Sequence, residues 1–245
     1  MKISIVGLGW FGEALALKLK PKHEILGTTR SQDKISTFAN QNIQAEELNL
    51  ALIPSENIFS SDVIILNIPP FHDQLAWFKS WPWKKTTHVI FISSTSVYGN
   101  IAGTVDESTT PMPDTENAKI LVAEEDWIAS FPAFTIIRFG GLIGANRHPG
   151  KILSGRQNVQ GGNLPVNLIH LNDCVNFVEL IIDKKLTGET FNLVNPEHPS
   201  RKAYYQGYCL KQNLALPEFL ESSEEGKIIS DIKTGQHYLC RWPLS

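Results

Sequence analysis

The sequence predicts an α/β fold in which helices cover both faces of a parallel β-sheet. Short apolar runs alternate with helical patterns along most of the chain, which is the arrangement that such a sheet requires. The first 30 residues read as a strand, a glycine-rich turn, a helix and a second strand. Two later runs, 62–68 and 87–92, are mostly apolar and fit buried strands. Together these observations predict a doubly wound fold whose ligand lies at the carboxyl ends of the strands.

The glycine-rich turn has the spacing G-x-G-x-x-G, and its place between a strand and a helix is the context of a dinucleotide-binding turn. Gly7 permits the tight turn, Gly9 lets a pyrophosphate approach the backbone, and Gly12 lets the helix pack close to the strand. The phosphates would face the free N–H groups and positive dipole end of the helix, as in a Rossmann-like site. The binding residues expected here are Gly7, Gly9, Trp10, Phe11 and Gly12. The alternative is a glycine turn that holds no ligand.

The end of the second strand indicates which dinucleotide is bound. An Asp or Glu there would accept hydrogen bonds from a ribose 2′-hydroxyl, but the chain has Thr29, Arg30 and Ser31 at this point. Arg30 is always charged and can hold a 2′-phosphate through two parallel hydrogen bonds, while Thr29 and Ser31 add hydroxyl donors. We therefore expect NADP as the cofactor, with NAD less favoured. Against this preference, Arg30 can instead be simply solvated, and Asp33 is close by in the sequence.

Composition indicates a single domain that acts on small molecules. A chain of 245 residues with 42% hydrophobic residues suits one large α/β domain, and a net charge of −3 argues against nucleic acid or a membrane surface as partner. No apolar run reaches the ~20 residues of a membrane span, and the first run is too short for a secretory signal peptide. The widely spaced Cys174, Cys209 and Cys240 fit reduced thiols. We expect a cytoplasmic protein without disulfides or a metal site.

The segments after the second strand continue the alternation. Ser31 can begin a short helix that runs to residue 38, and 43–48 is a weak third strand. The strong strand 62–68 ends at two prolines, which cannot extend a ladder of strand hydrogen bonds. In this fold that strand end faces the cofactor, although a plain strand end is the alternative. The cofactor neighbours expected from it are Asn67, Ile68 and Pro69.

Three tryptophans lie within or shortly after a helix expected over 71–79. They are Trp77, Trp81 and Trp83. We expect them to pack a helix end against the sheet, because aromatic side chains mostly serve the core; a ligand platform is the alternative.

The strand 87–92 leads into Ser93-Ser94-Thr95-Ser96-Val97-Tyr98-Gly99, and this motif resembles the extended short-chain dehydrogenase/reductases, the group of nucleotide-sugar epimerases and dehydratases. Four further motifs similar to that family follow in the expected order. They are Asp106-Glu107 with Pro111 and Pro113, Lys119-Ile120-Leu121-Val122-Ala123-Glu124, Ile137-Arg138-Phe139-Gly140-Gly141-Leu142-Ile143-Gly144, and Ile169-His170-Leu171-Asn172-Asp173. The resemblance covers nearly the whole chain, but 245 residues is short for an extended member and implies a trimmed C-terminal lobe.

In the family that the chain resembles, a Tyr-x-x-x-Lys pair carries the chemistry. The Tyr hydroxyl transfers a proton as hydride moves to or from the nicotinamide, and the Lys binds the nicotinamide ribose and lowers the pKa of the Tyr. The resemblance implies that Ser94 binds the substrate oxygen and that Lys119 takes the Lys role, yet Thr115 stands where the Tyr belongs. Tyr98 is a candidate substitute, although the family uses this Tyr to line the pocket. The alternatives are that Ser94 caps a strand end and that Lys119 is a solvated helix lysine.

The second half of the chain continues the pattern. We expect a helix from 115 or 116 to 129, strands over 135–139 and 189–194, and a helix over 174–183. The three carboxylates Glu124, Glu125 and Asp126 are expected on a solvated helix face. Asn172 or Asp173 is expected to cap the amino end of the helix 174–183, with His170 as a hydrogen-bonded residue at a strand end.

The loop that follows residue 144 is where this fold builds a substrate site. Arg147 and His148 in that loop are candidates to bind an anionic substrate. Tyr204, Tyr205 and Tyr208 form one aromatic stripe on a helix and are expected to pack in a core.

We expect one NAD(P)-binding Rossmann-like domain over 1–245, with segments of a small substrate lobe interleaved at about 145–168 and 197–245. The first functional hypothesis is an NADP-dependent oxidoreductase or epimerase/dehydratase-like enzyme that acts on a small carbonyl, alcohol or sugar-like substrate. The alternative is an NADP(H)-binding sensor or regulatory protein without redox turnover, because Thr115 replaces the catalytic Tyr of the family. The resemblance also implies a homodimer through flanking helices, for which the helix from Glu116 is the candidate.

Overall fold

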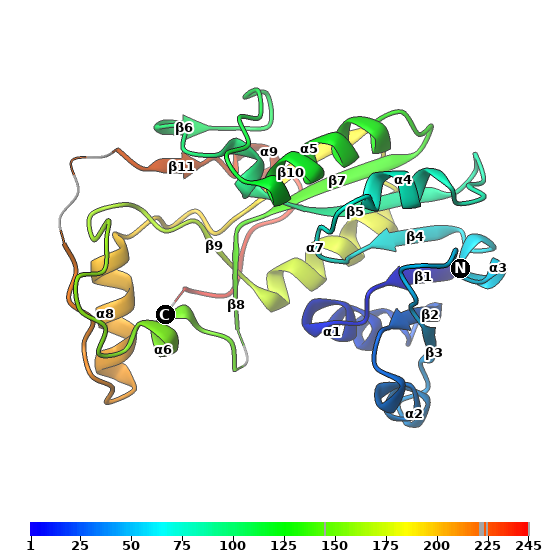
Figure 1. Ribbon diagram of the computed structural model, residues 1–245, viewed down its shortest axis with the longest axis horizontal. Helices are drawn as coiled ribbons and strands as arrows, with labels where there is room; N and C mark the ends of the chain where they lie inside the picture. Colours follow the sequence, from blue (N-terminus) through cyan, green and yellow to red (C-terminus); the bar gives the residue numbers. More distant parts are fainter. Residues whose placement is uncertain (145, 221–222, 224, 245) are drawn as a thin grey trace.

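A computed structural model describes residues 1–144, 146–220, 223 and 225–244 of the chain. In this described part, a parallel sheet of seven strands forms the centre of the molecule (Figure 1). The strands are β1 (Lys2–Val6), β2 (Glu24–Thr29), β3 (Gln44–Glu47), β4 (Val63–Leu66), β5 (His88–Ser94), β7 (Phe134–Phe139) and β10 (Glu189–Leu193). Their order across the sheet is β10-β7-β5-β4-β1-β2-β3. The predicted doubly wound fold is therefore confirmed.

The order of the strands places a crevice at the carboxyl ends of β1 and β4. Strand β1 pairs with β2 on one side and with β4 on the other, so the chain reverses direction across the sheet between β3 and β4. Ligands of doubly wound folds bind at this kind of switch point, because the loops after the two strands diverge there. The glycine turn follows β1, and Asn67 follows β4 with its backbone N–H donating to the carbonyl of Val6 (2.9 Å).

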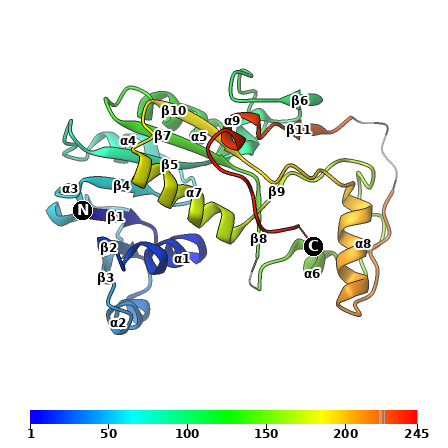
Figure 2. The same cartoon turned by 180° about the vertical axis from the view of Figure 1, so that it is seen from behind.

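Helices cover both faces of the sheet (Figure 2). The helices beside the sheet are α1 (Trp10–Leu19), α2 (Gln32–Asn40), α3 (Glu56–Phe59), α4 (Gln74–Lys79), α5 (Glu116–Ile128) and α7 (Leu171–Lys184). Leu15 of α1 and Phe177 of α7 belong to one buried cluster with Ile5 of β1. Phe78 of α4 and Leu121 of α5 belong to a second cluster on the opposite face. Each face thus has its own apolar core, as a doubly wound sheet requires.

The tryptophans in and after α4 pack in the second of these clusters. Trp81 is buried and meets the ring of Phe59 edge-on, with ring centroids 5.3 Å apart. Trp83 stacks on Trp81, and Trp77 meets Trp81 edge-on. The prediction that these rings pack a helix end against the sheet is therefore confirmed.

A smaller lobe lies beyond the carboxyl ends of the strands (Figure 1). Its elements are β8 (Gly141–Ile143), α6 (Pro149–Leu153), β9 (Leu168–His170) and α8 (Arg201–Lys211). Nearby are the 3-10 turn η1 (Thr95–Tyr98), the paired strands β6 (Gly103–Val105) and β11 (Lys227–Ile229), and α9 (Ile232–Gly235). Tyr204 and Tyr205 of α8 pack with Ile143 and Leu244 in a third buried cluster. Of the two predicted lobe segments, residues 145, 221, 222, 224 and 245 lie outside the described residues.

Two of the expectations for the helices are wrong. Glu124 and Glu125 were expected on a solvated face of α5, but their exposed fractions are 0% and 4%. They fall on the same stripe as Leu121 and Ile128, and the guanidinium of Arg138 on β7 bonds Glu125 (2.6 Å). The sequence of α5 alone predicted a solvated position for Glu125 because its partner, Arg138, lies on another element.

The cap of α7 differs from the prediction as well. The ring Nδ1 of His170, and not a side chain at 172 or 173, accepts the hydrogen bond from the backbone N–H of Asn172 (3.1 Å). The carboxylate of Asp173 is buried and accepts hydrogen bonds from the hydroxyl of Tyr238 (2.6 Å) and the backbone N–H of Arg241 (2.9 Å). It therefore ties the C-terminal segment to α7.

Three further properties belong to the part of the chain that the structure describes. None of its helices is long and apolar enough to cross a membrane. No three of its His, Cys, Asp or Glu side chains come together as a metal site requires. Its cysteines, Cys174, Cys209 and Cys240, are free thiols.

Candidate functional site

The glycine turn after β1 forms a cradle with an open centre. Gly7 has φ +107°, a conformation that glycine adopts without strain, and a Cβ there would overlap the carbonyl oxygen of Asn67. A Cβ at Gly12 would overlap the carbonyl oxygen of Gly7, because α1 begins directly above the turn. A Cβ at Gly9, by contrast, would meet no atom within 4 Å. The open space in front of Gly9 fits a pyrophosphate at the amino end of α1.

Neighbouring strand ends hold this turn in place. The backbone N–H of Leu8 donates to the carbonyl of Thr28 (2.7 Å), and that of Gly7 donates to the hydroxyl of Thr28 (3.1 Å). The side-chain amide of Asn67 donates to the carbonyl of Gly7 (3.0 Å). Asn67 therefore both positions the turn and lines the space beside it.

A groove runs across the carboxyl ends of β1 and β4 in two parts that share four lining residues: Gly9, Asn67, Ile68 and Pro69. The first part, of about 280 Å³, lies over the end of β2 and is also lined by Gly7, Leu8, Thr28, Thr29, Arg30, Ser31, Lys34 and Leu48. The second part, of about 300 Å³, lies toward β5 and is also lined by Trp10, Phe11, Pro70, Ile92, Ser93, Ser94, Leu121, Leu142 and Arg147. Every predicted cofactor residue except Gly12 and Lys119 lines this groove.

The first part of the groove ends in two cations. Arg30 and Lys34 are both exposed and line it, together with the hydroxyl residues Thr29 and Ser31. Asp33, which stood against the NADP preference, does not belong to this lining. Lys34 was missed by the sequence reasoning. It lies in the first turn of α2, shortly after the strand end that carries Arg30, so its position in the sequence was the signal that pointed to it.

The second part of the groove is lined by the hydroxyl residue Ser94 together with apolar side chains. Ser94 is half-buried at the end of β5, and its Oγ accepts a hydrogen bond from the backbone N–H of Ser96 (3.1 Å). Ile92 and Leu142 flank it as apolar surfaces. Ser94 therefore caps η1 and also faces the groove, and its predicted role at a substrate oxygen stays a prediction.

Thr115 and Lys119 lie at the start of α5. The hydroxyl of Thr115 accepts a hydrogen bond from the backbone N–H of Ala118 (3.2 Å), so Thr115 is the N-cap of the helix. The ammonium of Lys119 pairs with Glu116 at 2.7 Å, and 57% of its side chain is exposed. Neither residue lines the groove. The predicted role of Lys119 at the nicotinamide ribose stays a prediction.

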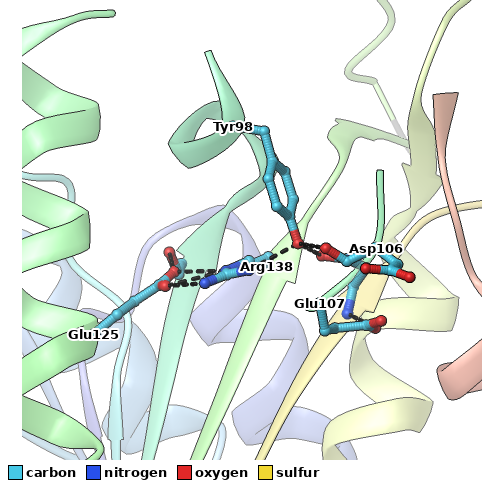
Figure 3. A network of polar contacts seen from close by, with 7 residues as sticks. Tyr98, Asp106, Glu107, Glu125 and Arg138 are labelled. Carbon is cyan, nitrogen blue, oxygen red and sulfur yellow. Dashed lines mark hydrogen bonds and ion pairs between the residues drawn. The ribbon is translucent and has the colours of Figure 1, made fainter. Parts of the chain in front are cut away.

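Tyr98 belongs to a buried polar network (Figure 3). Its hydroxyl donates toward two acceptors, the carbonyl of Asp106 (2.8 Å) and Oδ1 of Asn192 (2.9 Å), and accepts from Nη1 of Arg138 (2.7 Å). Arg138 in turn pairs with Glu125. Burial raises the pKa of Tyr98 above its usual value, although the charge of Arg138 acts against the shift. The hydroxyl is fully engaged away from the groove, and its predicted proton-transfer role stays a prediction.

A larger cavity of about 640 Å³ lies in the small lobe and shares Arg147 with the groove. The guanidinium of Arg147 lies over the ring of Trp10, 5.2 Å from its centroid, which connects the lobe to the glycine turn. His148 also lines the cavity, but both of its ring nitrogens are engaged, with Tyr204 (2.8 Å) and with the backbone N–H of Gly150 (3.0 Å). Burial lowers the pKa of His148 to about 4, so the ring is neutral at pH 7 and carries no charge for an anion.

The chain is similar to known proteins in both sequence and structure. Residues 2–95 match the family model described as NADP oxidoreductase, coenzyme F420-dependent. The chain is 30% identical to protein YeeZ of Escherichia coli strain K12, over 92% of this chain and 89% of that protein. In structure it resembles UDP-glucuronic acid 4-epimerase from Bacillus cereus in complex with NAD, with a TM-score of 0.79, 18% identity and coverage of 100% of this chain and 95% of that one.

A second solved structure has a similar fold. The dTDP-glucose 4,6-dehydratase from Bacillus anthracis in complex with NAD has a TM-score of 0.80 at 13% identity, over 99% of this chain and 92% of that one. At such identities the likeness shows a common Rossmann-like fold.

Proposed function

The chain belongs to the same protein family as Escherichia coli YeeZ, and we propose that it is an NADP(H)-dependent oxidoreductase or epimerase/dehydratase-like enzyme of the extended short-chain type. Its substrate in this proposal is a small molecule that carries a carbonyl, an alcohol or a sugar-like group. The similarity of residues 2–95 to NADP oxidoreductases and the fold shared with NAD-bound epimerases and dehydratases support the proposal.

One observation carries this proposal: a single groove connects a cationic end to a hydroxyl end across the glycine turn. Arg30 and Lys34 lie at one end, the open space over Gly9 lies in the middle, and Ser94 lies at the other end. A dinucleotide with a 2′-phosphate needs these three features in this order, because its phosphate, pyrophosphate and nicotinamide follow one another along the molecule.

Each part of the groove has a distinct task in this proposal. The guanidinium of Arg30 and the ammonium of Lys34 bind the 2′-phosphate, while the N–H groups at the start of α1 bind the pyrophosphate. The nicotinamide, when bound, supplies or accepts hydride. The hydroxyl of Ser94 donates a hydrogen bond to the oxygen of the reacting carbonyl or alcohol, and Ile92 and Leu142 exclude water from it.

A second candidate function rests on the start of α5. Thr115 serves as a helix cap, Lys119 pairs with Glu116 in solvent, and the hydroxyl of Tyr98 is held in the network with Arg138. A chain with these features can bind NADP(H) as a sensor or regulator without redox turnover. Cofactor binding is common to both candidates, whereas hydride transfer belongs to the first alone.

Calorimetric titration with NADP, NADPH, NAD and NADH tests the cofactor. We expect NADP(H) to bind more tightly than NAD(H), and Arg30→Ala to weaken NADPH about tenfold or more while it leaves NADH unchanged, since a charge-assisted hydrogen bond contributes about 1.5–3 kcal/mol. Lys85→Ala is the matched control, because Lys85 is exposed and does not line the groove. Absence of binding to all four nucleotides would reject both candidate functions.

Isotope transfer separates the two candidates. The protein is incubated with NADPH that carries deuterium at nicotinamide C4 and with a panel of aldehydes, ketones and sugar-like carbonyl compounds. Stereospecific appearance of deuterium in any product supports the enzyme and rejects the sensor. Tight NADPH binding without label transfer across the panel supports the sensor and rejects the enzyme.

A further inference from the structure

A cavity of the small lobe lies beside the cofactor groove and is separate from it. It is lined by the end of β8, by α6 and α8, and by the C-terminal segment 242–244, which come together beyond the sheet (Figure 1). Its volume of about 640 Å³ falls in the range of small-molecule sites, about 300–1,000 Å³. Arg147 lines both the cavity and the second part of the groove, so the two spaces adjoin at that residue.

Positive charge predominates in this basic cavity, as we call it. Arg147, Lys151 and Lys211 line it, and Glu197 is the one carboxylate among its lining residues. In the described part of the chain, the ion pairs include none of the three cations. Three cations that line one cavity without a carboxylate partner favour an anionic ligand there.

The ring of His170 also lines the cavity. Its Nδ1 accepts the hydrogen bond from the N–H of Asn172, so the neutral ring carries its proton on Nε2. The Nε2 atom lies against Gly144, 2.8 Å from the place where a Cβ would stand. The ring of Trp242 stacks on that of His170, with centroids 5.9 Å apart and planes 7° apart. This stacking fixes the ring and provides an apolar wall.

We propose that the basic cavity binds the substrate of the cofactor-linked reaction, and that this substrate is a small organic anion with an apolar body. The anionic group, a carboxylate or a phosphate monoester, contacts Arg147, Lys151 and Lys211, and the apolar body packs against Trp242. The assignment of the ligand as a substrate rests on the proposed function, because it requires the cofactor in the adjoining groove. The anion site itself rests on the lining of the cavity.

Tryptophan side chains provide separate signals for the two sites. The chain has six tryptophans, of which Trp242 lines the basic cavity and Trp10 lines the groove. The other four pack in the core on one face of the sheet and act as internal controls: Trp77, Trp81, Trp83 and Trp127. Indole N–H signals in ¹⁵N-labelled protein, assigned with Trp242→Phe and Trp10→Phe, report each site during a titration.

The probes are phenyl phosphate, phenylacetate and neutral benzyl alcohol. We expect at least one of the anions to shift the Trp242 signal saturably and benzyl alcohol to leave it in place; which anion binds identifies a phosphate or a carboxylate ligand. The double variant Lys151→Gln/Lys211→Gln should weaken the anion about tenfold, because two charge contacts are lost. Lys202→Gln is the matched control, since Lys202 is an exposed residue of α8 outside the cavity lining.

Three outcomes would overturn the anion site: no shift of Trp242 with either anion, an equal shift with benzyl alcohol, or equal anion affinity in the double variant and in Lys202→Gln. Titration with NADPH, monitored at Trp10, tests the proposed function in the same sample. If Trp242 responds to the anion but NADPH does not bind, the anion site stands and its assignment as a substrate site is rejected. If NADPH binds but the anions do not, the proposed function stands and the anion site is rejected.

Discussion

The Gly9→Ala substitution tests the glycine turn most directly, because it adds a methyl group where the folded protein has free space. Gly9 is the N-cap of α1 with φ −81° and ψ −162°, a backbone conformation that alanine adopts readily. Its added Cβ would meet no protein atom within 4 Å. The same Cβ would stand between a pyrophosphate and the N–H groups at the start of the helix.

The expected magnitudes for folding and binding therefore differ widely. Alanine is a poorer N-cap than glycine and destabilises the helix by roughly 0.5 kcal/mol. It also reduces the conformational entropy of the unfolded chain, which stabilises the folded protein by about 0.4–1 kcal/mol, so the two effects nearly cancel. The midpoint of thermal unfolding should shift by no more than about 2 °C. Loss of one or two charge-assisted hydrogen bonds to the pyrophosphate costs about 3 kcal/mol, which corresponds to about 100-fold weaker NADPH binding.

Calorimetry and thermal unfolding of wild type, Gly9→Ala and Gly12→Ala form the assay. Gly12→Ala is the matched control for a methyl group in the same turn. Its Cβ would overlap the carbonyl oxygen of Gly7, so we expect a loss of about 1–3 kcal/mol or more in the free energy of unfolding. Wild-type NADPH affinity in Gly9→Ala would refute the placement of the pyrophosphate over the turn. Destabilisation of Gly9→Ala as large as that of Gly12→Ala would refute the packing argument.

The remaining predictions concern the second face of the sheet and the end of β5. Burial without a partner raises the pKa of Glu124 from 4.5 to about 8; between these values the unfolded chain ionises and the folded protein does not, so stability falls as pH rises. In urea unfolding, the free energy of unfolding of Glu124→Gln relative to that of wild type should therefore rise by about 1.4 kcal/mol per pH unit in that window. A difference between the two proteins that does not change with pH would contradict the burial argument. Arg138→Met leaves Glu125 buried without its cation and should lower the free energy of unfolding by about 3–5 kcal/mol, with a loss below about 1 kcal/mol arguing against the ion pair. Tyr98→Phe should cost about 1–3 kcal/mol in stability and leave NADPH affinity unchanged by calorimetry; loss of NADPH binding in a folded variant would place Tyr98 in the site after all. Ser94→Ala should lower kcat about 100-fold with unchanged cofactor affinity if the chain transfers hydride, and unchanged kcat would remove Ser94 from the mechanism.

Local sequence patterns were sufficient to predict the strands of the central sheet and most of the residues that line the groove. The glycine turn, the end of β2 and the end of β4 are short segments whose residue types follow from the backbone and ligand contacts that each must make. Because parallel strands align their carboxyl ends, predicting the strands also predicted that Gly9, Arg30 and Asn67 would meet. Lys34 was accessible to the same reasoning, because it lies in the first turn of the helix that follows the end of β2.

The sequence by itself thus determined the alternation of strands and helices, the glycine turn and the position of Arg30 at the end of β2, because those signals depend on neighbours within a few residues. Only the tertiary structure decided that Glu125 is buried against Arg138, that Thr115 caps α5, and that α6, α8 and the C-terminal segment line a basic cavity. These features join segments that are far apart in the chain, or depend on which face of an element the rest of the molecule covers. Whether a charged side chain is solvated or paired is set by such distant neighbours, and the periodicity of a single helix does not contain that information.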